Sequence, residues 1–129
     1  MNPAPFEAKA GDLENGVRTI SVRGELDLST APELEGPLDQ AVESGEGSVL
    51  IDLTQCEFID STGIAVIVRS WQRLDKEGEA GGRGRLVLCC DNTQVMRLLR
   101  ITGVESSIAV HAEREEALAE LGGGAPAGA

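Results

Sequence analysis

The chain contains few aromatic residues and no long apolar run. Aromatic residues make up 2% of its 129 residues, and tyrosine is absent. Apolar residues make up 41%, so a core can form, but it has to be built from Val, Leu, Ile and Ala. No apolar run approaches the ~18 residues that a membrane-spanning helix needs, and no leader pattern is visible at the N-terminus. We therefore expect a single-domain cytoplasmic protein without a membrane segment.

Basic residues are also scarce. The sequence holds 11 Lys and Arg against 22 Asp and Glu, which gives a formal net charge of -11. Such a chain repels phosphate groups, so we expect no direct binding of nucleic acid. An acidic surface instead favours a partner with a basic patch, or serves solubility alone.

Cysteine and histidine are too few for the usual metal or catalytic clusters. Cys56, Cys89 and Cys90 match no zinc spacing, and we interpret them as small core residues of a reducing compartment. A redox role for Cys56 is the alternative. A serine hydrolase based on Ser61 would need the single histidine, His111, beside that serine, and no G-x-S-x-G or phosphate-loop motif occurs. We expect no enzyme, no metal and no cofactor.

Short β-branched segments alternate with amphipathic ones along the rest of the chain. Asn15-Gly16 indicates a turn that joins two strands into a hairpin. Further strands are expected at Ser48–Leu53, Arg85–Cys90 and Ser107–Val110, with helices after Ser29 or Thr30, from Ile64 to Glu77-Gly78, from Asp91 or Asn92 to Gly103, and over Arg114–Leu121. The order ββαβαβαβα predicts an α/β fold, with helices packed against a mixed sheet.

Two parts of the chain depart from this strand–helix pattern. Gly36-Pro37 lies inside the first expected helix and predicts a kink or a late helix start. Residues 1–5 and 122–129 are rich in Gly, Pro and Ala, and we expect them to be disordered around a domain of residues 6–121.

The stretch FIDSTG raises the question of function, because polar residues stand directly before the apolar run IAVIV. Asp60 or Ser61 can cap the helix that follows, a contribution of about 1 kcal/mol. A cap accounts for one polar residue, but less well for three in a row, Asp60, Ser61 and Thr62, and then Gly63. A phosphate on Ser61 would suit the N–H groups at a helix start, while its charge would repel a docked partner. The sequence therefore also allows a phosphorylation switch that leaves the fold intact.

Three segments resemble a known family. GELDLSTAPEL at 24–34, IDLTQCEFIDSTGIAVIV at 51–68 and NTQVMRLLRITGVES at 92–106 resemble the bacterial anti-sigma factor antagonists of the STAS-domain family. The resemblance covers Val17 to Leu121. It implies a single STAS domain with a four- to five-stranded mixed sheet and helices packed mainly on one side.

The resemblance also implies a function. Such antagonists bind an anti-sigma factor with a GHKL-type serine kinase fold, which releases a sigma factor, and a PP2C-type phosphatase reverses their phosphorylation. The implied phosphorylation site is Ser61, and the implied partner-binding residues are Asp27, Asp60, Ser61, Thr62 and Gly63. The alternative within the family is a STAS subunit of a transporter or a stress-signalling assembly that Ser61 phosphorylation does not control.

Overall fold

The computed structural model describes residues 5–44, 47–79 and 84–121, apart from the side chains of 75–79. Except for Pro5, the two ends that we expect to be disordered lie outside these residues.

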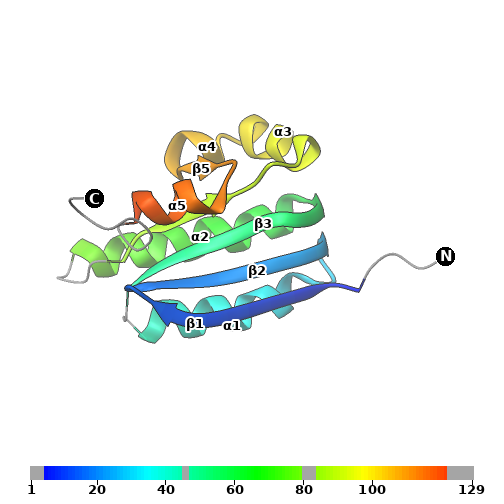
Figure 1. The fold of residues 1–129 in the computed structure, drawn as a ribbon. Helices are drawn as coiled ribbons and strands as arrows, with labels where there is room; N and C mark the ends of the chain where they lie inside the picture. Colours follow the sequence, from blue (N-terminus) through cyan, green and yellow to red (C-terminus); the bar gives the residue numbers. More distant parts are fainter. Residues whose placement is uncertain (1–4, 45–46, 80–83, 122–129) are drawn as a thin grey trace.

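The domain is built on one five-stranded sheet with the strands in the order β1-β2-β3-β4-β5. β1 runs antiparallel to β2, and every other neighbouring pair is parallel. The sheet is therefore mixed, as predicted (Figure 1). The strands are β1 (Glu7–Glu14), β2 (Val17–Leu26), β3 (Ser48–Ile59), β4 (Leu86–Cys89) and β5 (Val110–His111).

The turn between β1 and β2 forms where the sequence predicts it. Asn15 and Gly16 both have positive φ angles, 53° and 79°. Two successive positive φ angles make the kind of hairpin turn whose twist matches that of the flanking strands, and Asn-Gly tolerates them best.

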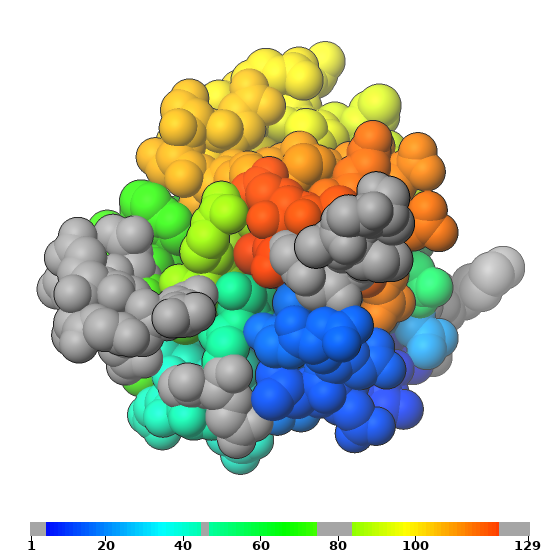
Figure 2. Space-filling view, turned by 60° about the vertical axis from the view of Figure 1, so that its left-hand side comes forward, coloured from blue at the N-terminus to red at the C-terminus, as the bar shows by residue number. Residues whose placement is uncertain are grey.

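The helices cover mainly one face of the sheet. α1 (Ala31–Ser44) and α2 (Ser61–Glu79) pack behind the sheet in Figure 1, while α3 (Thr93–Ile101) and α4 (Val104–Ser107) lie beyond β4. α5 (Arg114–Glu120) packs on the opposite face, where Ala117 joins a small separate cluster with Val17 and Leu50. The space-filling view shows this C-terminal segment between α3–α4 and the β1–β2 hairpin (Figure 2). The predicted arrangement is confirmed.

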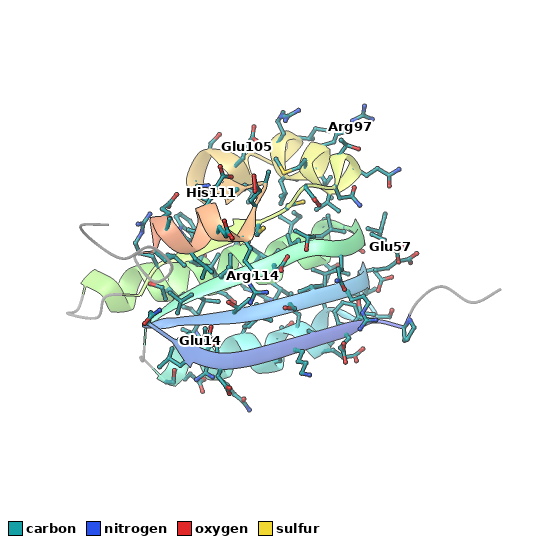
Figure 3. The ribbon with its side chains drawn as sticks, in the orientation of Figure 1. Glu14, Glu57, Arg97, Glu105, His111 and Arg114 are labelled. Atoms are coloured by element: carbon teal, nitrogen blue, oxygen red, sulfur yellow. The ribbon has the colours of Figure 1, made fainter. Side chains whose placement is uncertain are left out.

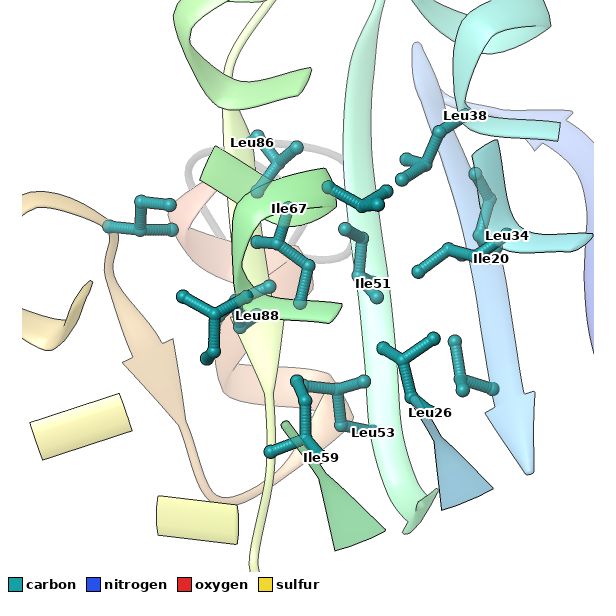
Figure 4. Close-up of a cluster of buried hydrophobic side chains, with 14 of the residues drawn as sticks. Ile20, Leu26, Leu34, Leu38, Ile51, Leu53, Ile59, Ile67, Leu86 and Leu88 are labelled. Atoms are coloured by element: carbon teal, nitrogen blue, oxygen red, sulfur yellow. The ribbon is translucent and has the colours of Figure 1, made fainter. Parts of the chain in front are cut away.

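Aliphatic side chains form the main core between the sheet and α1, α2 and α3. Ile20, Leu26, Leu34, Ile51 and Ile67 are fully buried there (Figure 4). Each such side chain contributes roughly 1.5–3 kcal/mol when it leaves water. The core therefore forms without a fully buried aromatic ring among the described residues, as the composition predicts.

Of the two alternatives predicted at Gly36-Pro37, the structure excludes a late helix start. α1 starts at Ala31 and continues through Pro37 to Ser44, so the helix does not start late. Pro37 removes one backbone N–H donor, but Leu34 and Leu38 on either side are fully buried in the core. This packing holds the helix where local propensity alone would interrupt it.

The predicted strand Ser107–Val110 is also wrong in its position. Residues Val104–Ser107 form the single-turn helix α4 after Gly103, which has a φ of 80°. The last strand is confined to Val110 and His111, which pair with Leu88 and Cys89 of β4. Since β4 is itself only four residues long, its edge offers few backbone groups to a further strand.

Candidate functional site

The predicted site residues meet at one end of the sheet. Leu26 at the end of β2 pairs with Ile59 at the end of β3, and the backbone N–H of Asp60 donates to the carbonyl oxygen of Leu26 at 3.1 Å. Asp27 and Asp60 are the next residues after these paired strand ends. Because the two strands are parallel, both loops emerge on the same edge, as in the ligand-binding crevices of open α/β sheets.

Asp60 caps helix α2. Its Oδ1 accepts hydrogen bonds from the backbone N–H groups of Thr62 at 2.9 Å and Gly63 at 3.1 Å. These groups have no partner inside the helix, and a carboxylate at the positive end of the helix dipole stabilises them. Of the two caps that the sequence allows, the structure therefore uses Asp60 and leaves Ser61 as the first helical residue.

Ser61 is exposed, and Thr62 is half-buried. Neither hydroxyl makes a hydrogen bond to any residue that the structure describes. Because Asp60 already caps the helix, the Ser61 hydroxyl is not needed for the cap and makes no other stabilising hydrogen bond in the described part of the chain. It is available to a partner or a modifying enzyme.

Asp27 organises the loop that leads into α1. Its Oδ1 accepts hydrogen bonds from the Ser29 hydroxyl at 2.7 Å and from the Ser29 and Thr30 backbone N–H groups at 3.0 and 3.2 Å. The hydrogen bond from the Ser29 hydroxyl is the largest cause that lowers the pKa of this carboxyl. Desolvation is next in size and opposes it, while the Thr30 and Ser29 backbone N–H groups add to the lowering. The Asp27 carboxylate therefore stays ionised, and it holds the loop beside Asp60 in a fixed shape.

Gly63 is the buried member of the predicted set. A Cβ placed on it would lie 2.7 Å from Cγ of Leu26 and 3.0 Å from Cγ1 of Ile59. The absence of a side chain thus lets the first turn of α2 sit directly on the ends of β2 and β3. Its contacts are internal, and its effect on the site is to place Asp60 and Ser61.

The structure gives no support to a hydrolase at Ser61. His111 lies on β5, which β4 separates from β3, and its Nε2 is 2.6 Å from Oε1 of Glu120 on α5. Figure 3 places His111 and α5 together on one face of the sheet. The contact with Glu120 thus links His111 to α5. No hydrogen bond in the described part of the chain joins His111 to Ser61.

The cysteines are core residues, as predicted. All three thiols are free and buried. Burial raises the pKa of the Cys56 and Cys89 thiols from 9.0 to about 11, and it also raises the pKa of Cys90. A thiol that stays protonated is a poor nucleophile and a poor metal ligand. Among the described residues no group of His, Cys, Asp and Glu is placed to hold a metal ion.

An apolar groove lies beside the site and was not predicted from the sequence. It has a volume of about 540 Å³ and lies between Phe58 and Ile59 at the end of β3 and the α3 residues Val95, Leu98 and Ile101. Phe58 is 46% exposed and Ile101 is 72% exposed. The signal in the sequence was the number of apolar residues in α3. One buried helix face cannot cover all of them, so some must be exposed.

Leu28 is a further exposed apolar residue that was not singled out from the sequence. It is 74% exposed and stands next to Asp27 in the loop between β2 and α1. Exposed large apolar side chains that gather at one end of a molecule mark an interaction surface.

Together these features define an α/β domain that presents a capped helix start, an exposed serine hydroxyl and apolar side chains at one end of its sheet. The STAS domain family model matches residues 12–117, so the chain belongs to the STAS domain family. Within the described residues, none of the helices combines the length and the apolar character of a membrane span.

Similar proteins carry related names. The chain is 36% identical over 92 residues to an anti-sigma-B factor antagonist of Listeria monocytogenes, covering 70% of this chain and 75% of the relative. It is 31% identical over 102 residues to the anti-sigma-B factor antagonist of Bacillus subtilis, covering 79% and 87%.

Two solved structures have the same fold. An anti-sigma factor antagonist from Mycobacterium paratuberculosis has a TM-score of 0.81 at 24% identity and covers 91% of this chain and 94% of its own. The Bacillus cell fate determinant SpoIIAA in its phosphorylated form has a TM-score of 0.66 at 18% identity and covers 88% and 97%.

Proposed function

We propose that this protein is an anti-sigma factor antagonist that phosphorylation of Ser61 switches off. In the unphosphorylated state it binds an anti-sigma factor with a GHKL-type serine kinase fold, so that a sigma factor is released. The kinase then phosphorylates Ser61, and a PP2C-type phosphatase restores the active form. The protein acts in the cytoplasm as a binding module, not as an enzyme, and it contacts neither nucleic acid nor membrane.

The observation that carries the proposal is the exposed Ser61 hydroxyl on the first residue of α2, beside a cap already formed by Asp60. The names of the relatives and the phosphorylated form of SpoIIAA support it. In this proposal Asp27, Asp60, Ser61 and Thr62 contact the partner, while Gly63 keeps the helix start in place.

The geometry indicates how phosphate would act. Asp60 already accepts from the N–H groups of Thr62 and Gly63, so a phosphate on Ser61 finds these donors occupied. About two negative charges then remain on the surface next to the Asp60 carboxylate. A docked partner would have to bury the phosphate charge next to the Asp60 carboxylate. The free-energy cost of burying these two like charges exceeds that of the lost contacts alone. Binding is thereby switched off without unfolding the domain.

The first experiment maps phosphate on the protein purified from its own cells by mass spectrometry across residues 56–69, before and after phosphatase treatment. We expect one phosphate, on Ser61. The protein and its Ser61→Ala and Ser61→Asp variants then serve as baits to identify the kinase, which is purified for direct binding.

Ser61→Ala should bind that kinase but accept no phosphate, and Ser61→Asp should bind at least about tenfold more weakly, since it imitates part of the added charge. Equal binding of Ser61→Asp and wild type would overturn the switch. A stoichiometric partner that uses no ATP, with Ser61 unmodified under every growth condition, would instead favour the STAS subunit of a transporter or stress-signalling assembly.

A further inference from the structure

We infer that the groove between the end of β3 and α3 receives an apolar side chain of the anti-sigma kinase, with a neighbouring carboxylate of the kinase paired to Arg97. This inference rests on the proposed function and adds a second contact region to it, separate from the Ser61 hydroxyl.

The lining of the groove is mostly apolar and partly exposed, with Thr93, Gln94 and Arg97 as its polar members. Its floor holds Ile59 and Val95, which are 4% and 1% exposed, while Phe58 and Ile101 rise along its sides. Two of the four exposed large apolar residues of the described chain therefore border this one hollow. Side chains of this kind in water are unfavourable unless a partner covers them. A volume of about 540 Å³ is enough for a few partner side chains.

Arg97 supplies the polar contact at the rim. Among the arginines whose side chains the structure describes, it alone has neither an ion pair nor a hydrogen bond. Its neighbour on α3, Arg100, pairs with Glu105 at 3.4 Å. Acids outnumber bases 22 to 11 in this chain, so an unpaired guanidinium stands out. A planar donor group at an apolar rim fits a carboxylate of the partner.

The position of the groove connects it to the proposed site. Phe58, Ile59, Asp60 and Ser61 are consecutive residues, so the wall of the groove leads directly to the hydroxyl. Figure 3 shows Arg97 on α3 and Glu57 at the tip of β3 at the same end of the molecule. One partner surface that reaches Ser61 thus lies within reach of the groove.

The groove is also held open in a fixed shape. The Asn92 side chain at the start of α3 donates from Nδ2 to the carbonyl oxygen of Cys56 on β3 at 3.2 Å. The same side chain caps α3 by accepting from the backbone N–H groups of Gln94 and Val95. A preformed groove requires little reordering when a partner binds, which favours affinity.

The test measures binding of the purified anti-sigma kinase that wild type captures, by calorimetry, to the variants Ile101→Asp and Arg97→Glu. Each variant should weaken binding about tenfold or more. Ile101→Asp places a charge in the groove, and Arg97→Glu places a negative charge against the partner's carboxylate. Arg97→Lys should bind more tightly than Arg97→Glu, because it keeps the positive charge, but more weakly than wild type, because it loses the planar donor group. The Arg97 contribution should shrink as salt is raised.

Matched controls carry the same changes elsewhere. Leu13→Asp alters an exposed apolar residue on β1, and Lys9→Glu reverses a charge on the same strand. Both should bind like wild type. Circular dichroism and thermal melting establish that all five variants are folded, which is expected for exposed positions.

A kinetic readout separates the groove from the Ser61 chemistry. Ile101→Asp and Arg97→Glu should raise the KM of the kinase for this protein and leave kcat unchanged, because neither residue touches the reacting hydroxyl. If Ser61→Asp loses the kinase but both groove variants bind as wild type does, the groove inference is overturned and the proposed function stands. If wild type binds no anti-sigma kinase, or Ser61→Asp binds normally, the proposed function itself fails and the groove inference falls with it.

Discussion

Gly63 on α2 and Leu26 at the end of β2 lie so close that a single added methyl group would collide with the leucine: a Cβ on Gly63 would be 2.7 Å from Cγ of Leu26. Leu26 is fully buried in the core, so it has little room to give way. This contact fixes the height at which α2 starts above the sheet. It therefore also fixes where Asp60 and Ser61 stand.

Gly63→Ala should destabilise the fold by about 1–3 kcal/mol, the usual cost of forcing an extra methyl group into a packed core. Urea unfolding measures the change. Gly36→Ala is the matched control, since Gly36 lies in α1 with nothing within 4 Å of the added Cβ. Alanine should stabilise that helix by roughly 0.5–1 kcal/mol. Two changes of the same sign would contradict the packing argument.

Asp60→Ala should remove the cap of α2 and cost about 1 kcal/mol of stability. Asp60→Asn should keep most of this stability, because the amide oxygen of asparagine also accepts from the Thr62 and Gly63 N–H groups. The pair of variants separates capping from charge.

Asp60→Asn also tests the role of charge in the proposed switch. Phosphorylated Asp60→Asn should bind the kinase better than the phosphorylated wild type, because one of the repelling acids is gone. If the phosphorylated forms bind equally weakly, Asp60 adds nothing to the effect of the phosphate.

The buried thiols predict a fall in stability at alkaline pH. Burial raises the pKa of Cys56 and Cys89 from 9.0 to about 11, so between these values the folded protein holds protons that the unfolded chain releases. The folded state therefore binds more protons, and the free energy of unfolding should decrease as the pH rises from about 9 to 11.

Urea unfolding at a series of pH values measures this decrease. No tyrosine is present to titrate in the same range. Cys89→Ala should be less stable at neutral pH but should show a shallower alkaline decrease. An equal slope in the variant and the wild type would show that Cys89 is not held protonated.

Asn92→Ala should lose both the cap of α3 and the link to Cys56, at a cost of about 1–2 kcal/mol. Asn92→Asp should keep the cap but lose the donor, and its carboxylate would face the Cys56 carbonyl oxygen. We therefore expect thermal melting to place Asp between Ala and wild type. If Asp equals wild type, the link to β3 contributes nothing measurable.

Several features of the protein follow from the sequence alone. Asn15-Gly16 specified the hairpin turn, because these two residue types tolerate positive φ angles. The sequence offered Asp91 or Asn92 as the cap of the third expected helix, and Asn92 forms it through hydrogen bonds to residues only two and three positions further on. The motifs around Asp27 and Ser61 indicated the STAS family, to which the chain belongs. All of these signals are local in the chain.

Other features were decided by contacts between distant segments. Burial of Leu34 and Leu38 carries α1 through Pro37, although a proline predicts an interruption there. The short edge of β4 confines the last strand to Val110 and His111, against the longer strand that its sequence suggests.

The site itself depends on the register of β2 and β3. That register brings Leu26 beside Ile59 and leaves no room for a side chain at position 63. The packing of α3 beside the end of β3 likewise creates the groove and leaves Arg97 at its rim. Such features join residues 30 or more positions apart, so their energies depend on tertiary packing that no short stretch of sequence encodes.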